Sequence, residues 1–338
     1  MSTPLKSPIT SDPDDQALDT ALRPSRFSDY VGQEQVKKNL AILVGAARKR
    51  KESLEHILIH GSSGLGKTTL AYIIAKEFGS GIRITSGTAL EKAGDIGSIL
   101  TGLADGDVLF IDEVHRLHKA IEETLYPAME NYQLDIVIGK GASAKTLQVA
   151  LPRFTLIAAT TRLSLLSNPF RSRFGVHYKL EFYTQEEMEE ILRRSAQLLK
   201  IPIKEEALAI IARASRFTPR IANRLLKRVR DYAQVKNHPT ITGDFASEAL
   251  GLLGIDALGL EQTDHQIILT IAEQFQGGPA GLKSIAAAIG EEEETIEEVY
   301  EPYLMRMGFL TRTARGRIIT DLARDHLKLP RNAPPTLI

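Results

Sequence analysis

The chain has 338 residues, of which 43% are hydrophobic and 25% charged, so it has the composition of an ordinary globular protein and a length that suits two or three domains. Lys plus Arg equals Asp plus Glu at 42 each, and cysteine is absent, which excludes disulfides and thiolate metal sites and fits a cytoplasmic protein. There is no apolar run of roughly 18 residues and no N-terminal signal pattern, so the sequence does not predict a membrane protein or a secreted one.

The first 20 residues are mostly Ser, Thr, Pro and Asp, which predicts a disordered tail. Residues 21–183 then alternate short apolar runs with helical patterns. Wholly apolar runs of this kind are typical of strands in a parallel sheet that is covered on both faces. We therefore expect an α/β domain with strands at 56–60, 82–85, 108–111 and 155–159.

The rest of the chain has two further patterns. Residues 184–256 carry apolar residues at helical spacing and no strand signal, which predicts a small all-α domain. Within it, Thr218 and Pro219 resemble a helix N-cap followed by proline at the first helical position. Residues 257–338 predict helices near 263–275, 281–289 and 292–307, followed by strands at 309–313 and 317–320, which is the order of a winged helix.

Residues 61–68, GSSGLGKT, fit the phosphate-binding loop GxxxxGK[ST] and stand between an apolar strand and a helical run. The glycines allow backbone N–H groups to surround phosphate oxygens, and the helix N-terminus adds its dipole. In this pattern Lys67 would reach the β- and γ-phosphates of ATP, and the Thr68 hydroxyl would bind Mg²⁺. The alternative is a glycine-rich turn that happens to contain a lysine.

The strand expected at 108–111 leads directly into two acids, Asp112 and Glu113. Ligands bind at the carboxyl ends of strands in open α/β sheets, so Asp112 would hold Mg²⁺ and Glu113 would polarise the attacking water. Thr160 and Thr161 follow the strand expected at 155–159 and could sense the γ-phosphate. The alternatives are two solvated acids and two threonines placed by β-propensity alone.

Three arginines lie where a nucleotide would use them. Arg171 and Arg173 follow the last core strand, where an arginine can reach the γ-phosphate bound by a neighbouring subunit. Arg220 falls in the first turn of a predicted helix, where a cation opposes the helix dipole unless an anion lies nearby. For each of them an exposed arginine in water is the alternative.

The remaining signals concern macromolecular partners. The turn at 309–320 carries Arg312, Arg315 and Arg317, and such a wing suits DNA phosphates, although turns are often polar for other reasons. The stretch 213–230 holds seven basic residues and no acidic ones, so positive charge is segregated despite the neutral total. Two alternating segments within 132–151 predict a second hairpin, which would either bind a partner or pack on its own domain.

From about residue 21 to 329, an ordered set of segments resembles the RuvB family of bacterial Holliday-junction motors. Those that carry the resemblance include LRP (22–24), DYVGQ (29–33), GLGKTT (64–69), LFIDEVHR (109–116), LYPAME (125–130), RSRFG (171–175), TPRIANRLL (218–226) and GFLTRT (308–313). The resemblance implies an α/β P-loop AAA+ domain, a small all-α lid and a C-terminal winged helix. It also implies a homohexamer that uses ATP and Mg²⁺ to pump duplex DNA and branch-migrate Holliday junctions, with RuvA as partner and the RuvC resolvase in the larger complex.

Individual roles carry over from the family by position. The resemblance assigns Arg173, rather than Arg171, as the finger that acts on the neighbouring subunit, and Arg220 as the nucleotide-sensing lid arginine. It assigns DNA contact to Arg312 and Arg317, and RuvA docking to the hairpin at 132–151. The nucleotide-contacting set that it implies consists of Leu22, Arg23, Gly64, Lys67, Thr68, Thr69, Glu130, Asn131, Tyr132, Arg173, Tyr183 and Arg220.

Two departures and two alternatives accompany this interpretation. Ser62 and Ser63 replace the family's two prolines, which predicts a less preorganised loop, and Ala158 stands where glycine is common. A nucleotide-gated loading factor related to clamp loaders would not need the winged helix. A winged-helix transcriptional regulator would need a helix that reads DNA bases. The third helix predicted here holds seven glutamates and no basic residue at 291–301, and this negative charge disfavours close approach to DNA.

Overall fold

The computed structural model describes residues 20–138 and 145–330 of the chain. By its internal contacts the chain divides into two compact units, residues 21–183 and the part that follows Tyr183. The tail predicted at residues 1–20 lies outside the described residues, apart from Thr20. Among the described helices, none has the length and apolar character needed to cross a membrane.

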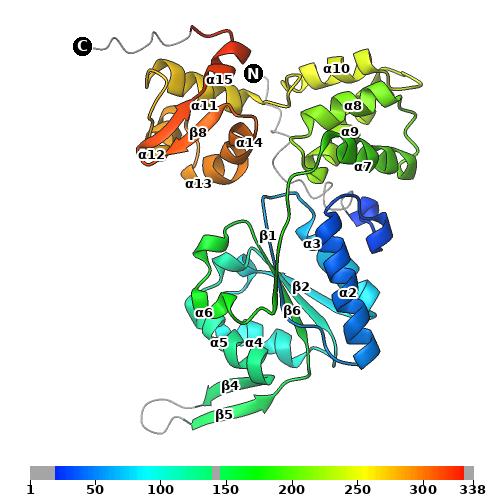
Figure 1. Ribbon diagram of the computed structural model, residues 1–338, viewed down its shortest axis with the longest axis vertical. Coiled ribbons are helices and arrows are strands. Elements are labelled where there is room, and N and C mark those ends of the chain that lie inside the picture. Colours follow the sequence, from blue (N-terminus) through cyan, green and yellow to red (C-terminus); the bar gives the residue numbers. More distant parts are fainter. Residues whose placement is uncertain (1–19, 139–144, 331–338) are drawn as a thin grey trace. The chain divides into compact units, whose positions relative to one another are not determined.

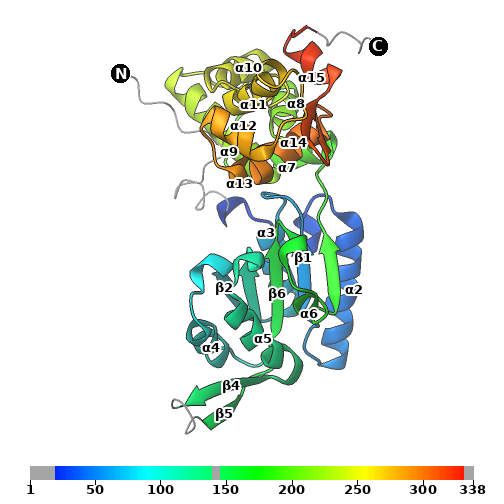
Figure 2. The same cartoon turned by 90° about the vertical axis from the view of Figure 1, so that its left-hand side faces the viewer.

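The first unit is built on a five-stranded parallel sheet of order β2-β3-β6-β1-β7 (Figure 1). The four predicted strands are confirmed as β1 (Ile57–His60), β2 (Ile82–Ser86), β3 (Val108–Asp112) and β6 (Thr155–Thr160). The helices are α2 (Glu34–Arg50), α3 (Lys67–Phe78), α4 (Ala93–Thr101), α5 (Lys119–Asn131) and the short α6 (Asn168–Arg171). In Figure 2, α2 and the pair α4 and α5 lie on opposite sides of the sheet.

Burial explains why these strands are readable in the sequence. Every residue of β6 is buried, and Val108 to Ile111 of β3 are fully buried, so both strands consist of continuous apolar or small residues. Burying a large aliphatic or aromatic side chain contributes about 1.5–3 kcal/mol. The edge strand β7 (Val176–Lys179) was missed because only Tyr178 of its four residues is buried, which leaves no apolar run.

The hairpin expected at 132–151 is present as β4 (Gln133–Ile138) and β5 (Lys145–Ala150), paired antiparallel outside the main sheet. Its base packs on the domain, since Leu134 and Leu151 belong to the buried core. Leu147, farther along β5, is half exposed.

The second unit begins with four helices, α7 (Gln185–Leu198), α8 (Glu205–Ala214), α9 (Pro219–Val235) and α10 (Gly243–Leu252). Thr184 and Glu187 form a capping box that fixes the start of α7. The predicted start of α9 is confirmed at Pro219, with Thr218 in the N-cap position. The Thr218 side chain does not cap the helix, however, because its hydroxyl donates to the Ser215 carbonyl.

The winged helix follows in the expected order. Its elements are α11 (Gln262–Glu273), α12 (Leu282–Ile289), α13 (Glu293–Thr295), a π-helical turn (Ile296–Tyr300), α14 (Glu301–Arg306), the strands β8 (Leu310–Thr313) and β9 (Gly316–Ile319), and α15 (Asp321–His326). The single helix predicted at 292–307 is therefore a helix interrupted by one wide turn. Pro302, at the start of α14, has no N–H to continue the α-helical bonding.

Candidate ATPase site and DNA-binding wing

The phosphate loop joins β1 to α3 at the carboxyl edge of the sheet. Gly61, Gly64 and Gly66 have φ angles of 144°, 79° and 96°, which residues with a side chain rarely adopt. Lys67 is buried at 6% exposure, and its Nζ donates to the carbonyls of Gly61 and Ser62 at 2.8 and 3.0 Å. The lysine therefore lies across its own loop, within the turn that would surround a phosphate.

Two tyrosine hydroxyls hold the phosphate loop through one of its backbone carbonyls. The Tyr183 hydroxyl donates to the Leu65 carbonyl at 3.1 Å, and the Tyr30 hydroxyl donates to the same carbonyl at 3.3 Å. The Tyr183 hydroxyl also lies 3.1 Å from that of Tyr30, and burial raises the pKa of Tyr30 to about 12, so this phenol stays neutral. Tyr183 came from the resemblance, whereas Tyr30 was missed because no local pattern indicates a contact 35 residues along the chain.

The magnesium candidates meet at the carboxyl edge of the parallel sheet. Thr68 is the second residue of α3 and Asp112 is the last residue of β3, and the Thr68 hydroxyl donates to the Asp112 carboxylate at 3.3 Å. A hydroxyl and a carboxylate are oxygen ligands of the kind that Mg²⁺ prefers. The residues present therefore fit this ion. Thr69 follows on the same helical turn.

Glu113 directly follows β3 with a φ of 45° and is held by two side chains. The Thr161 hydroxyl donates to its carboxylate at 3.1 Å, and His115 Nδ1 lies 3.2 Å from the same oxygen. His115 Nδ1 is also 2.9 Å from the Thr160 hydroxyl, at the end of the neighbouring strand β6. Parallel pairing of β3 with β6 thus gathers the acid and both predicted threonines, together with a histidine that the sequence did not single out.

Arg173 lies in a separate cluster near the end of α5. Its guanidinium is 3.0 Å from the Glu130 carboxylate, donates to the Pro169 carbonyl at 2.6 Å and stacks 4.0 Å above the Tyr126 ring. Arg171 bonds instead to Asn168, within its own short helix. The structure therefore joins Glu130 with Arg173. Asn131 is exposed beside them, and Tyr132 packs edge-on against Phe154 in the core.

The other nucleotide candidates lie near the helices that surround the loop and in the lid. Leu22 is buried, and the Arg23 guanidinium lies 4.1 Å above the ring of Tyr72 on α3. Arg220 is the second residue of α9, as the sequence predicts, so its cation does lie in a helical first turn.

The wing contains two very different arginines. Arg317 is 8% exposed and is clamped to the buried Glu301, with its Nε and terminal nitrogen 3.2 and 2.8 Å from one carboxylate oxygen. The side chain of Arg312 is 52% exposed and lies 3.2 Å from Glu297 and 3.9 Å from Glu301. Arg315, at the tip of the turn, is exposed. Of the two arginines expected to contact DNA, only Arg312 is presented at the surface.

Comparisons with known proteins agree over residues 22–328. Three family models match in series: the Holliday junction DNA helicase RuvB P-loop domain at residues 22–180, the RuvB AAA lid domain at 183–256 and the RuvB C-terminal winged helix domain at 257–328. The Holliday junction branch migration complex subunit RuvB of Dehalococcoides mccartyi is 55% identical over 317 residues, which cover 94% of this chain and 91% of that protein. The Thermotoga maritima RuvB Holliday junction branch migration motor is 48% identical, with a TM-score of 0.85 over 92% of this chain and 100% of that one.

A P-loop sheet with this strand order, a helical lid and a winged helix defines an AAA+ ATPase that carries a DNA-binding module. The three matched domains account for residues 22–328 without a gap longer than two residues. The chain belongs to the RuvB family, and it is a branch-migration ATPase that acts on Holliday junctions.

Proposed function

We propose that this motor hydrolyses ATP with Mg²⁺ at the interfaces of a homohexameric ring and uses the energy to pump duplex DNA through a Holliday junction. The observation that carries the proposal is the convergence of Lys67, Thr68, Asp112 and Glu113 at one edge of the sheet, with the Glu113 carboxylate held by Thr161. Bound Mg²⁺ would neutralise phosphate charge, held by Thr68 and Asp112. Gly64 and Thr69 would add backbone and side-chain contacts to the phosphates.

Each side chain has a distinct task in this proposal. Lys67 exchanges its two loop carbonyls for β- and γ-phosphate oxygens, which gives the ammonium charged acceptors in place of neutral ones. Glu113 accepts a hydrogen bond from the attacking water, and Thr161 and His115 keep its carboxylate beside the end of β6. Thr160 and Thr161 would respond to the γ-phosphate. Leu22, Arg23 and Tyr183 would line the nucleotide pocket. Tyr183 would also hold the phosphate loop through its hydrogen bond to the Leu65 carbonyl.

Arg173 acts on the nucleotide of the neighbouring subunit. Within its own subunit its guanidinium is already oriented by Glu130 and by the Tyr126 ring. An arginine held in this way loses less side-chain entropy when it meets a γ-phosphate, and it would stabilise the charge of the transition state. Glu130, Asn131 and Tyr132, at the end of α5, would also contact nucleotide. Arg220 would sense the nucleotide from the lid.

The wing contacts the DNA backbone without reading its sequence. Arg312 is exposed and can reach phosphates, whereas the buried Arg317 supports the wing through Glu301. The hairpin β4–β5, which presents Leu147, would dock RuvA, and the RuvC resolvase would join the larger complex. The absence of cysteine in the chain fits work in the reducing cytoplasm.

The experiment that tests this function measures ATP hydrolysis with and without a four-way DNA junction and RuvA, for the wild type and for Glu113→Gln. The amide keeps the shape of Glu113 but cannot act as a base, so we expect hydrolysis to fall by about 10²-fold or more while ATP binding persists. Only the wild type should convert junctions into separate duplex arms by branch migration. Equal hydrolysis by both proteins would refute the role of Glu113, and normal hydrolysis with static junctions would refute the proposed pumping.

A further inference from the structure

The segment that connects α8 to α9 in the lid has an unusual backbone. Arg216 and Phe217, two consecutive residues with large side chains, have φ angles of 54° and 55°. The left-handed conformation is unfavourable for a non-glycine residue, and such strain persists where surrounding contacts impose it. These two residues lie four and three positions before Arg220, the proposed nucleotide sensor.

Arg216 inserts into the winged helix. Its side chain is 3% exposed, its Nε donates to the Gly259 carbonyl at 2.9 Å, and its terminal nitrogen pairs with the fully buried Asp264 of α11. The guanidinium also lies 5.1 Å from the ring centre of Tyr303 on α14. Burial raises the pKa of Asp264 to about 6, and the Arg216 charge opposes that rise, so the pair is ionised at neutral pH. A buried, ionised pair of this kind is directional and is costly to separate.

Phe217 makes the second half of the contact. Its ring packs against the core of the winged helix, 6.3 Å from the ring of Tyr303, and the Arg306 guanidinium lies 4.7 Å above it. Gly259, which follows the lid, approaches Ala214 so closely that a Cβ there would lie 2.4 Å from the Ala214 carbonyl oxygen. The end of α8 is therefore in backbone contact with the segment that begins the winged helix.

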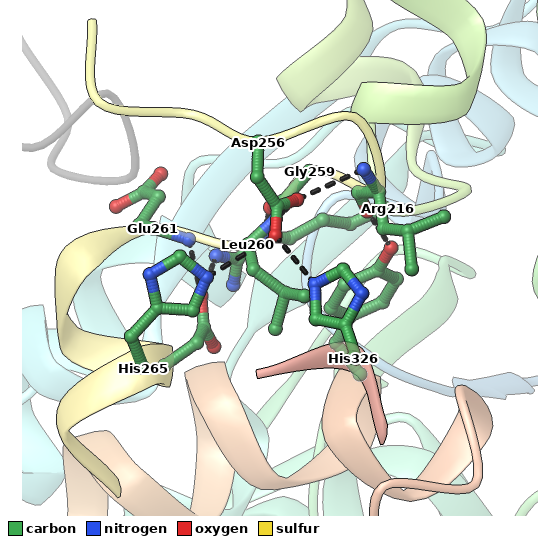
Figure 3. Close-up of polar contacts among 10 residues, drawn as sticks. Arg216, Asp256, Gly259, Leu260, Glu261, His265 and His326 are labelled. Atoms are coloured by element: carbon green, nitrogen blue, oxygen red, sulfur yellow. Dashed lines mark hydrogen bonds and ion pairs between the residues drawn. The ribbon is translucent and has the colours of Figure 1, made fainter. Parts of the chain in front are cut away.

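A separate polar cluster fastens the same junction. One Asp256 oxygen accepts the backbone N–H groups of Leu258 and Leu260, and the other lies 3.1 and 2.8 Å from Nε2 of His265 and His326 (Figure 3). Burial alone would raise the pKa of Asp256, but these hydrogen bonds outweigh it and hold the pKa well below its usual range. The cluster ties the last lid residue to both α11 and α15, and its groups satisfy one another.

We infer that Arg216 is a positioning residue for branch migration: with Phe217, it makes the winged helix follow every reorientation of α9. This inference rests on the proposed sensing of nucleotide by Arg220. The sensor then stands in the first turn of α9, and the two anchor residues stand in the segment that leads into that helix. A lid that turned without this anchor would hydrolyse ATP without dragging the wing and its bound phosphates. Glycine would adopt the left-handed backbone at these two positions more easily. Large side chains there fit a role in transmitting movement from the lid to the winged helix.

The first readout is the number of base pairs migrated per ATP hydrolysed by the full-length protein with RuvA and a four-way junction. Arg216→Ala should lower this ratio by about fivefold, the low end of typical coupling between sites, while the ATPase rate per subunit changes little. Phe217→Gly removes the ring but relieves the positive φ, so it should fold well and lower the ratio in the same direction. Gln197→Ala, at an exposed position on α7 outside the basic stretch, is the control and should leave the ratio unchanged.

The second readout uses the absence of cysteine in the chain. Spin labels at Ser247→Cys on α10 and Ser284→Cys on α12, both exposed, report the distance between lid and winged helix. The distribution should be narrow and equal with ADP and with a non-hydrolysable ATP analogue, and should broaden in Arg216→Ala. A wild-type ratio in both Arg216→Ala and Phe217→Gly, or a distribution that changes with nucleotide in the wild type, would overturn the inference. Wild-type hydrolysis by Arg220→Ala would instead refute the sensor role alone.

Discussion

At the scale of single residues, the phosphate loop depends on contacts that lie outside its motif. The motif names Gly66, but the reason that only glycine fits is tertiary: its φ is 96°, and a Cβ would lie 2.8 Å from the Tyr30 hydroxyl. The sequence pattern therefore predicted the residue type correctly and could not predict the neighbour. The same holds for His115, whose contact with the Thr160 hydroxyl arises only when β3 and β6 pair.

Gly66→Ala should destabilise the loop and weaken ATP binding. The left-handed backbone costs an alanine roughly 1–2 kcal/mol, and displacement of the Tyr30 hydroxyl breaks its bond to Leu65. We expect a lower melting temperature and at least about tenfold weaker binding of a fluorescent ATP analogue, which corresponds to about 1.4 kcal/mol.

Gly94→Ala is the matched control for this substitution. Gly94 lies in α4, and nothing lies within 4 Å of the position that an added methyl group would occupy, so alanine there should be neutral or stabilising. Equal ATP affinity for Gly66→Ala and the wild type would contradict the requirement for glycine at position 66.

At the scale of elements, the wing shows where pattern reading ends. Arg312 and Arg317 face each other across the β8–β9 hairpin, so alternation assigns them to the same face. Only Arg317 is buried. Its backbone also pairs with Ala280, and its guanidinium contacts Glu301 on α14. The sequence predicted the hairpin and its charge, but the burial of one arginine depends on helices that the hairpin pattern does not contain.

The two arginines should therefore respond differently to truncation. Arg312→Ala should leave the free energy of unfolding within about 0.5 kcal/mol and reduce the salt dependence of DNA binding by about one phosphate contact. Arg317→Ala leaves Glu301 buried without this partner and should destabilise the protein by about 3–5 kcal/mol. Thermal melts and junction binding at several salt concentrations measure both effects.

Arg315→Ala serves as the control for charge alone, since Arg315 is exposed at the turn. If Arg317→Ala melted like the wild type and lost DNA binding as Arg312→Ala does, Arg317 would be a direct DNA contact, as the family resemblance implies.

At the scale of the whole molecule, the three predicted domains are present in the predicted order. They could be predicted because each has its own periodicity and composition. The structure nevertheless groups the lid and the winged helix into one compact unit. Their junction depends on Arg216, which the sequence analysis counted only as one of the basic residues at 213–230, and on Phe217 and Asp256, which it did not single out. Contacts between domains leave no periodic signal, and this is why the sequence could not predict them.

The proposed placement of Arg173 across a subunit boundary has a consequence that can be measured in mixtures. Glu113→Gln keeps the finger but loses the base, and Arg173→Ala keeps the base but loses the finger. In rings with head-to-tail interfaces assembled from equal amounts of both, about one interface in four would pair an intact base with an intact finger.

ATP hydrolysis by the mixture should therefore exceed that of either variant alone, up to about a quarter of the wild-type rate. Each variant mixed with the wild type provides the calibration. If the two inactive variants remain inactive together although they assemble, Arg173 serves its own subunit or has no part in hydrolysis.

The pairing of Arg312 with Glu297 and Glu301 also bears on speed. A motor must release each phosphate that it holds before it can take the next one, so very long residence times would stall it. In this wing the two carboxylates lie 3.2 and 3.9 Å from the arginine and compete with DNA for the same cation. If Arg312 is the residue that contacts DNA phosphates, competition from these two carboxylates shortens the lifetime of each contact. Rapid dissociation of this kind favours continuous translocation over tight binding.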